Sequence, residues 1–443
     1  MGKTSRYFVL AGATLLLLTG CEGLPFGPTA STPQPAPSPT APAPILQPSM
    51  ATATAGVVET PTSAEPRILT VWVPEALAPN AETAGGQALI DQIATFEEQH
   101  ADFRVDLYTK LATGPGSTLA YLYSAPGVAP GILPDLALLD RAALVQAARD
   151  NLIVPIEALI DSALLGDLYP AALELGTVNE QLVGLPYVLQ VAHVAYRETL
   201  FQAPPNSFEA VLNSPVPYVF PAGTLGNVNE TLLLQYMAAG GTLADETGAP
   251  FVDPLVLTEV LEFYAAAHEK GVVDPALFQL TDMSESWAQY VSRQAGLAAV
   301  TSTAYLKGRA EVRNTGVTWT PTLNGEPYAL ASGWMWVMVT RDPDRQVAAL
   351  SLVNHLMNPI NQGTYTQAAG WLPSQASALA VWGDSDPYAA FGDRLLRSAV
   401  AFPDATLQAS VGAALQDALE AVLLSGMPPF QAAAEAAQKI NSP

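Results

Sequence analysis

The chain is poor in cysteine, in basic residues and in histidine, and each scarcity excludes a class of site. Its 443 residues include one cysteine, Cys21, which excludes an intramolecular disulfide and a cluster of thiolate metal ligands. Only 18 residues are Lys or Arg against 41 Asp or Glu, giving a formal net charge of −23. Such an acidic chain is a poor partner for nucleic acid or anionic lipid.

Sequence signatures of enzymes are also missing. The four histidines, at positions 100, 193, 268 and 355, lack a second ligand at metal-binding spacing. There is no Gly-x-Ser-x-Gly elbow, no phosphate-binding loop and no dinucleotide fingerprint. Asp384 and Asp386 are spaced like the start of a calcium loop, but the later ligands are absent, so we expect a solvated turn. We predict no metal, no cofactor and no catalytic residue, and expect His193 to be a satisfied core residue.

The N-terminus has the pattern of a secretory signal. Lys3 and Arg6 precede an apolar run, residues 7–18, that is too short for an ordinary membrane span. Small residues then lead into Cys21, and this arrangement resembles the lipobox of bacterial lipoproteins. The resemblance implies a signal peptide over residues 1–20, cleavage before Cys21 and lipid attached to its sulfur; the alternative is an uncleaved anchor. Two or more acyl chains would anchor an exported protein stably to a membrane, facing the periplasm or the cell exterior.

The next segment, residues 21–66, is dominated by Pro, Ala, Thr and Ser, with the densest stretch at residues 33–44. Such a composition cannot bury enough apolar surface to offset the entropy of ordering the chain. We therefore expect a disordered tether between the lipidated cysteine and the folded body.

Strand and helix patterns alternate from Arg67 onward, which predicts an α/β fold with mainly parallel sheets. Hydrophobic residues make up 49% of the chain, enough for more than one core. The expected strands are residues 68–73, 104–110, 134–140, 187–196, 217–221, 296–303, 317–321 and 329–339, and the expected helices are 87–99, 118–123, 141–150, 230–239, 254–270, 286–294, 344–357 and a terminal helix at 408–424.

One strand organises the rest. Residues 187–196 are apolar except for Gln190 and His193, a pattern typical of a strand buried on both faces. Because strand and helix patterns lie on both sides of it, we predict that this strand carries the chain from one α/β lobe to another. Residues 329–339 are a second candidate for such a crossing.

Several segments form a pattern through their order and spacing: residues 69–72, 96–100, 104–106, 134–135 with Asp140, 184–186, 196–201, 296–300, 333–334 and 370–373. Together they resemble the family 1 extracellular solute-binding proteins, the substrate receptors of ABC importers that include maltose-binding protein. The resemblance implies a two-lobed periplasmic-binding-protein-like fold of type II, with a ligand cleft at the hinge. One lobe would comprise residues 67–188 and 330–376, and the other residues 189–329 and 377–443.

By position in the family's pattern, ligand-contacting residues would be Glu75, Asp140, Arg141, Gln190, Thr224, Asn227, Tyr305 and Trp334. Carboxylates, amides and guanidinium groups can bond sugar hydroxyls, and aromatic faces can cover the C–H patches of a sugar ring. The chain departs from the family in having Val-Pro-Glu after Trp72 and Tyr305 at the place of a frequent stacking Trp. Simpler roles remain open: Asp140 as a helix N-cap, Trp334 as a core residue.

The resemblance implies a function as an extracytoplasmic receptor. We expect a monomer that captures a small solute, a carbohydrate by preference, and delivers it to ABC permease subunits in the membrane. A receptor for a polyamine, a peptide fragment or a phosphate ester is an alternative. A lipid-anchored glycoside hydrolase also remains open, because carboxylates that could form a facing pair are abundant.

Overall fold

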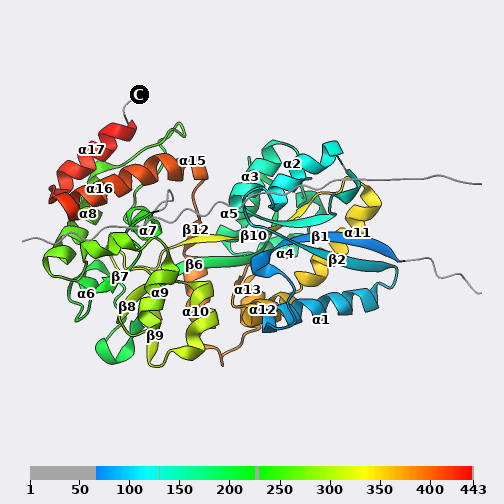
Figure 1. Ribbon diagram of the computed structural model, residues 1–443, viewed down its shortest axis with the longest axis horizontal. Helices are drawn as coiled ribbons and strands as arrows, with labels where there is room; N and C mark the ends of the chain where they lie inside the picture. The colour runs from blue at the N-terminus through cyan, green and yellow to red at the C-terminus, as the bar shows by residue number, and fades with distance from the viewer. Residues whose placement is uncertain (1–65, 129, 225–228, 442–443) are drawn as a thin grey trace, which may run out of the picture. The chain divides into compact units, whose positions relative to one another are not determined.

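The computed structural model describes residues 66–128, 130–224 and 229–441 (Figure 1). The predictions for the signal peptide, Cys21 and the tether up to residue 65 lie outside these residues, as does Asn227. The described residues belong to one compact unit. Within the described ranges, no helix is both long and apolar enough to cross a bilayer.

The first part of the sheet is parallel. Strand β1 (Arg67–Pro74) lies between β2 (Phe103–Lys110) and β3 (Leu136–Asp140), and it pairs in parallel with both. Helix α1 (Ala84–Gln99) connects β1 to β2, and helix α2 (Thr118–Val128) lies between β2 and β3. Helix α3 (Arg141–Arg149) follows β3 directly. These βαβ units place the carboxyl ends of β1, β2 and β3 at one edge.

Strand β6 (Leu185–Arg197) is the expected crossing strand. Its first half pairs with β10 (Ala329–Met338), and its second half pairs with β8 (Leu297–Thr301) and β9 (Thr315–Thr318). In Figure 1, β6 and β10 run side by side between the β1–β3 group and the β7–β9 group. The sheet order is β2-β1-β3-β10-β6-β8-β7, where β7 is Tyr218–Val219. The prediction of a buried strand is confirmed, and its role in linking two lobes stays a prediction.

The expectation of mainly parallel pairing is only partly met. Pairing is parallel in β2-β1-β3, between β7 and β8, and between β10 and β12 (Ala399–Ala401). Strands β6 and β10 instead pair antiparallel with each other. Strand β10 also pairs antiparallel with β3, and β6 pairs antiparallel with β8, β9 and β11 (Leu372–Pro373). The reason is that β10 returns beside β6 in the opposite direction, which the hydrophobic pattern of either strand cannot reveal.

The remaining helices cover the sheet and extend the C-terminal part. They include α4 (Ser162–Asp167), α5 (Pro170–Gly176), α6 (Phe208–Leu212), α7 (Glu230–Ala238), α8 (Pro254–Glu269), α9 (Met283–Val291), α10 (Ser302–Gly308), α11 (Pro343–Leu356), α12 (Pro359–Ala369), α13 (Ala376–Ala380), α14 (Pro387–Arg397), α16 (Ala413–Ser425) and α17 (Pro429–Asn441). The helix expected at 408–424 begins with a π-helical turn, Gln408–Gly412, and continues as α16. It is not the terminal helix, because α17 follows it.

Two further predictions are corrected by the packing. Asp386 does not lie in a solvated turn: it is buried, and Arg309 binds both of its carboxylate oxygens at 2.6 and 2.7 Å. Burial alone would raise the pKa of Asp386, but the hydrogen bonds from Arg309 and from the Tyr388 amide lower it below its usual range. His193 is buried as expected, yet neither ring nitrogen is hydrogen-bonded to a described residue. Burial lowers the pKa of His193 to about 3, so its ring is neutral.

Candidate functional site

Four polar or half-exposed side chains interrupt the otherwise buried centre of the sheet. Asp140 is the only residue of β3 that is not buried, and Ser332 and Trp334 are the only such residues of β10. Within β6, Gln190 is the only half-buried position before the last residue. The strand register pairs Trp334 with Asp140 and Ser332 with Gln190. These four side chains therefore form an accessible line at the centre of the sheet, across strands β3, β10 and β6.

A cavity of about 460 Å³ lies at one end of this line, between α3 and the segment that follows β12. The side of α3 contributes Asp140, Arg141 and Arg149, strand β10 contributes Ser332 and Gly333, and the opposite wall includes residues 402–406 and Gln408. This volume lies within the range of small-molecule sites, roughly 300–1,000 Å³. The cavity is at the carboxyl end of β3, which is where ligands bind in sheets of this kind.

Asp140 is both the N-cap of α3 and a wall of the cavity. Its Oδ1 accepts a hydrogen bond from the Ala143 amide at 2.8 Å, so the expected capping role is confirmed. Among the described residues, no hydrogen bond uses its Oδ2. One carboxylate oxygen is thus engaged by the helix and the other is available to a bound molecule.

Arg141 is held in place by the C-terminal end of α5. Its Nη1 donates to the carbonyl oxygens of Leu175 at 3.0 Å and Thr177 at 2.6 Å. Burial lowers the pKa of Arg141, and the carboxylates of Asp404 and Glu174 oppose this effect. Arg141 therefore presents a fixed guanidinium group at the cavity, facing the carboxylate of Asp404 on the other wall.

The structure places Gln190 and Trp334 next to the cavity but not in its wall. Gln190 is the register partner of the lining residue Ser332, and Trp334 is the partner of the lining residue Asp140. Trp334 packs partly against a core cluster, so its simpler role as a packing residue is at least partly confirmed. No hydrogen bond between described residues involves the Gln190 amide, although the side chain is only half-exposed.

Tyr305 lies elsewhere. It is buried in α10, where it stacks on Tyr388 at 5.2 Å and meets the His193 ring edge-on at 5.3 Å. His193 and Gln190 are three positions apart on β6, so their side chains leave the strand on opposite faces. The Tyr305 ring thus packs against other aromatic rings, and its contact with a ligand remains a prediction.

Glu75 and Thr224 are not among the residues that line the cavity. Glu75 is exposed at the start of a 3₁₀ turn, Glu75–Leu77, that follows β1. Thr224 is half-buried at the end of a loop that precedes α7. Close to that loop, the first residue of α7, Glu230, is half-buried, and burial together with the Asp282 carboxylate raises its pKa to about 7.

Sequence reasoning missed one whole wall of the cavity. Phe402 and Asp404 follow β12, a strand of three residues that is too short to show a hydrophobic period. Arg149 was assigned only as part of a helix. The pair Pro403-Asp404 is a helix-start signal that could have drawn attention to this segment, because Asp404 caps the short helix α15 (Ala405–Leu407).

Comparison with known proteins places the chain in a family. The family model described as "Bacterial extracellular solute-binding protein" matches residues 91–391. No curated protein matches the chain. Among solved structures, the cyclic alpha-maltosyl-1,6-maltose binding protein from Arthrobacter globiformis is 18% identical, with a TM-score of 0.68 over 85% of this chain and 98% of that one.

Two further structures are similar. The sugar-binding protein MalE from Xanthomonas citri is 18% identical, with a TM-score of 0.68 over 84% of this chain and 96% of that one. An ABC transporter solute-binding protein from Thermotoga lettingae, bound with alpha-D-tagatose, is 18% identical, with a TM-score of 0.63 over 85% and 99%. Identities this low show a common α/β fold of the maltose-binding-protein type. Since the family model spans most of the folded body, the chain belongs to the bacterial extracellular solute-binding protein family, whose members are solute receptors of ABC transporters and not enzymes.

Proposed function

We propose that this receptor captures a small neutral carbohydrate in the cavity between α3 and the segment after β12. The observation that carries the proposal is the charge balance of the cavity: two carboxylates, Asp140 and Asp404, and two guanidinium groups, Arg141 and Arg149, line it. A polyamine or a phosphate ester would leave one pair without a counter-charge, which is costly in a partly desolvated site.

The lining chemistry also suits a sugar. Carboxylates accept hydrogen bonds from hydroxyl groups, and guanidinium groups donate to hydroxyl and ring oxygens. Phe402 adds an apolar surface that can cover the C–H patches of a ring. The similar structures named above include one that is described as binding a cyclic maltose derivative and one with bound tagatose, so this fold accommodates sugars of different sizes.

We propose that capture occurs by hinge closure between two lobes, residues 67–188 with 330–376 and residues 189–329 with 377–443. Two observations support this. Strand β6 pairs with β10 in its first half and with β8 and β9 in its second half, so it continues from one strand group into the other, as a hinge segment must. The cavity also takes its walls from both proposed lobes: Asp140, Arg141 and Ser332 from the first, and Phe402 and Asp404 from the second. A solute that bonds both walls would favour the closed population.

The cellular setting follows from the N-terminal sequence. Cleavage before Cys21 and lipid on its sulfur would fix the exported protein to a membrane, with residues 22–66 as the spacer. The folded body would then work as a monomer close to its ABC permease. This arrangement keeps the captured solute within reach of the transporter.

Calorimetric titration with a panel of mono- and oligosaccharides tests the ligand class. We expect saturable one-to-one binding of at least one sugar, and loss of that binding in Asp404→Ala, which removes a carboxylate from the second lobe's wall. Asp91→Ala, which alters an exposed carboxylate on α1, is the matched control. If the panel gave no binding and the purified chain carried a cationic or phosphorylated molecule in mass spectrometry, the carbohydrate proposal would be wrong.

A further inference from the structure

A second cavity lies at the opposite edge of the sheet. It has a volume of about 650 Å³ and is bounded by the amino ends of β1 and β3, by α2, and by the connection from β10 to α11. Asp135, which immediately precedes β3, lines this cavity, whereas Asp140 at the other end of the same strand lines the candidate solute cavity. Asp135 and Asp140 are five positions apart, which corresponds to about 16 Å along an extended strand. The two cavities are therefore independent sites.

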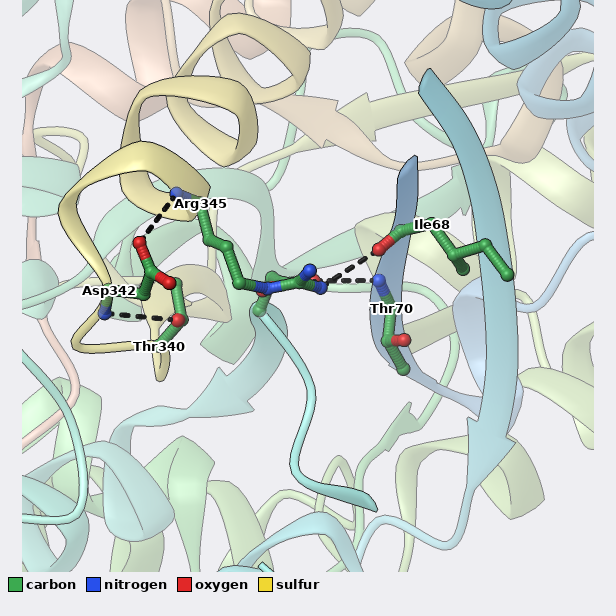
Figure 2. Close-up of polar contacts among 6 residues, drawn as sticks. Ile68, Thr70, Thr340, Asp342 and Arg345 are labelled. Carbon is green, nitrogen blue, oxygen red and sulfur yellow. Dashed lines mark hydrogen bonds and ion pairs between the residues drawn. The ribbon is translucent and has the colours of Figure 1, made fainter. Parts of the chain in front are cut away.

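One wall of this cavity is an ion pair between buried Asp135 and half-exposed Arg345. The Arg345 guanidinium donates to both carboxylate oxygens of Asp135, at 2.6 and 2.5 Å, and also to the Ile68 carbonyl oxygen at 2.8 Å. Figure 2 shows this side chain reaching from α11 to β1, where the Thr70 amide donates to Asp135 at 2.8 Å. The charge of Arg345 is thus compensated within the protein, and the pair makes a rigid, neutral wall.

Arg341 supplies the uncompensated charge of the cavity. Its Nη2 donates to the Asn151 carbonyl oxygen at 2.6 Å, and the side chain is exposed at the rim. Among the described residues, no carboxylate forms an ion pair with it. The nearest acidic residue in sequence, Asp342, is directed at the first turn of α11, where it accepts from two backbone amides. In a chain of net charge −23, this rim is locally cationic.

The remaining walls are largely apolar. Leu122, Leu133, Pro134, Leu152 and Val339 line the interior, and all five are buried or half-buried. The Asn151 side chain and the Thr340 hydroxyl stand beside Arg341 as further hydrogen-bonding groups. A guanidinium next to an apolar wall matches a molecule that has an anionic end and a compact hydrocarbon body.

We propose that this cavity is a second ligand site, for a small organic carboxylate with an apolar body. The carboxylate binds the Arg341 guanidinium and the Asn151 amide, and the body fills the space between Leu122, Leu133 and Leu152. The ligand would contact four chain segments of the first proposed lobe, so its binding also stabilises that lobe. It does not touch the cavity that we assign to the transported solute.

Titration of the full chain with phenylacetate, followed by ligand-observed NMR and calorimetry, tests the proposal. We expect saturable one-to-one binding in the millimolar range or tighter. Acetate lacks the apolar body and 2-phenylethanol lacks the charge, so each should bind at least about ten-fold more weakly. Arg341→Gln should weaken phenylacetate binding about ten-fold or more, because a charge-assisted bond is lost.

Two other variants keep the test decisive. Asn151 has a positive φ of 53°, so Asn151→Gly keeps the turn and removes only the amide, and it should weaken binding about three-fold. Arg313→Gln, an exposed arginine elsewhere, should change nothing. The proposal would be overturned if Arg341→Gln bound phenylacetate with unchanged affinity, or if binding did not saturate by about 20 mM phenylacetate. It would also be overturned if Arg149→Gln, a variant of the other cavity, lost binding.

Discussion

Asp140 offers a separation of binding from stability, because its two carboxylate oxygens have different partners. Oδ1 caps α3 through the Ala143 amide at 2.8 Å, and Oδ2 is available to a solute. Asn is as good an N-cap as Asp, so Asp140→Asn keeps the cap and removes the charge that faces the cavity. We therefore expect unchanged stability and weaker binding in this variant.

The expected size follows from the bond that changes. A hydrogen bond to a charged group contributes about 1.5–3 kcal/mol, against about 1 kcal/mol for a neutral one. Asp140→Asn should thus cost about 0.5–2 kcal/mol of binding free energy, a rise of about two- to thirty-fold in Kd. Asp140→Ala should in addition lose about 1 kcal/mol of the free energy of unfolding, because the cap is lost.

Calorimetry with the tightest-binding sugar measures the affinity, and urea unfolding measures the stability. Asp342→Asn is the matched control, since Asp342 caps α11 in the same way but lies away from the candidate solute cavity. It should leave the Kd unchanged. Equal affinities for wild type and Asp140→Asn would refute the assignment of this carboxylate to the solute site.

Three further predictions concern packing and charge. Arg345→Met leaves the Asp135 carboxylate, which is 3% exposed, without its ion-pair partner, and should lower the free energy of unfolding by about 3 kcal/mol in urea. Gly333→Ala would place a Cβ 2.1 Å from a carbonyl oxygen of β6, so the crossing strands must separate, and thermal unfolding should show a loss of at least about 2 kcal/mol. In urea unfolding, Glu230→Gln should have a larger free energy of unfolding than wild type at pH 8 and the same free energy of unfolding at pH 4.

The sign of the Glu230 effect follows from linkage. Its folded-state pKa, about 7, lies above its ordinary value of 4.5, so the folded protein holds this proton more tightly than the unfolded chain. The wild type therefore loses stability as pH rises from about 4.5 to 7, and Gln removes that loss. Parallel pH profiles for wild type and variant would contradict this explanation. For the packing variants, losses below about 0.5 kcal/mol would contradict the roles assigned to Arg345 and Gly333.

Local patterns in the sequence were enough to locate most of the sheet. The run from Tyr187 to Tyr196 has the apolar character of a buried strand, and it lies within β6. Trp72, in the strand expected at residues 68–73, is 3% exposed. Asp140 could be identified as an N-cap, because the strand–Asp–helix pattern is contained in a few consecutive residues.

What the sequence did not reveal depends on contacts between distant residues. Asp386 was expected to be solvated because its partner, Arg309, is 77 positions away. The wall containing Asp404 belongs to a segment that reaches β10 only through the short strand β12. Tyr305 was assigned by position in a family pattern, but the aromatic rings that cover it, Tyr388 and His193, come from different elements. Helix α17 was missed although the chain there is rich in alanine, a strong helix former.

The most direct test of solute capture between two lobes is a crystal structure of the chain with its tightest-binding sugar. The account predicts density for that sugar between Asp140 and Arg141 on one wall and Phe402 and Asp404 on the other, with hydrogen bonds to both walls. A sugar bound outside this cavity, or bound to residues of one lobe alone, would contradict it.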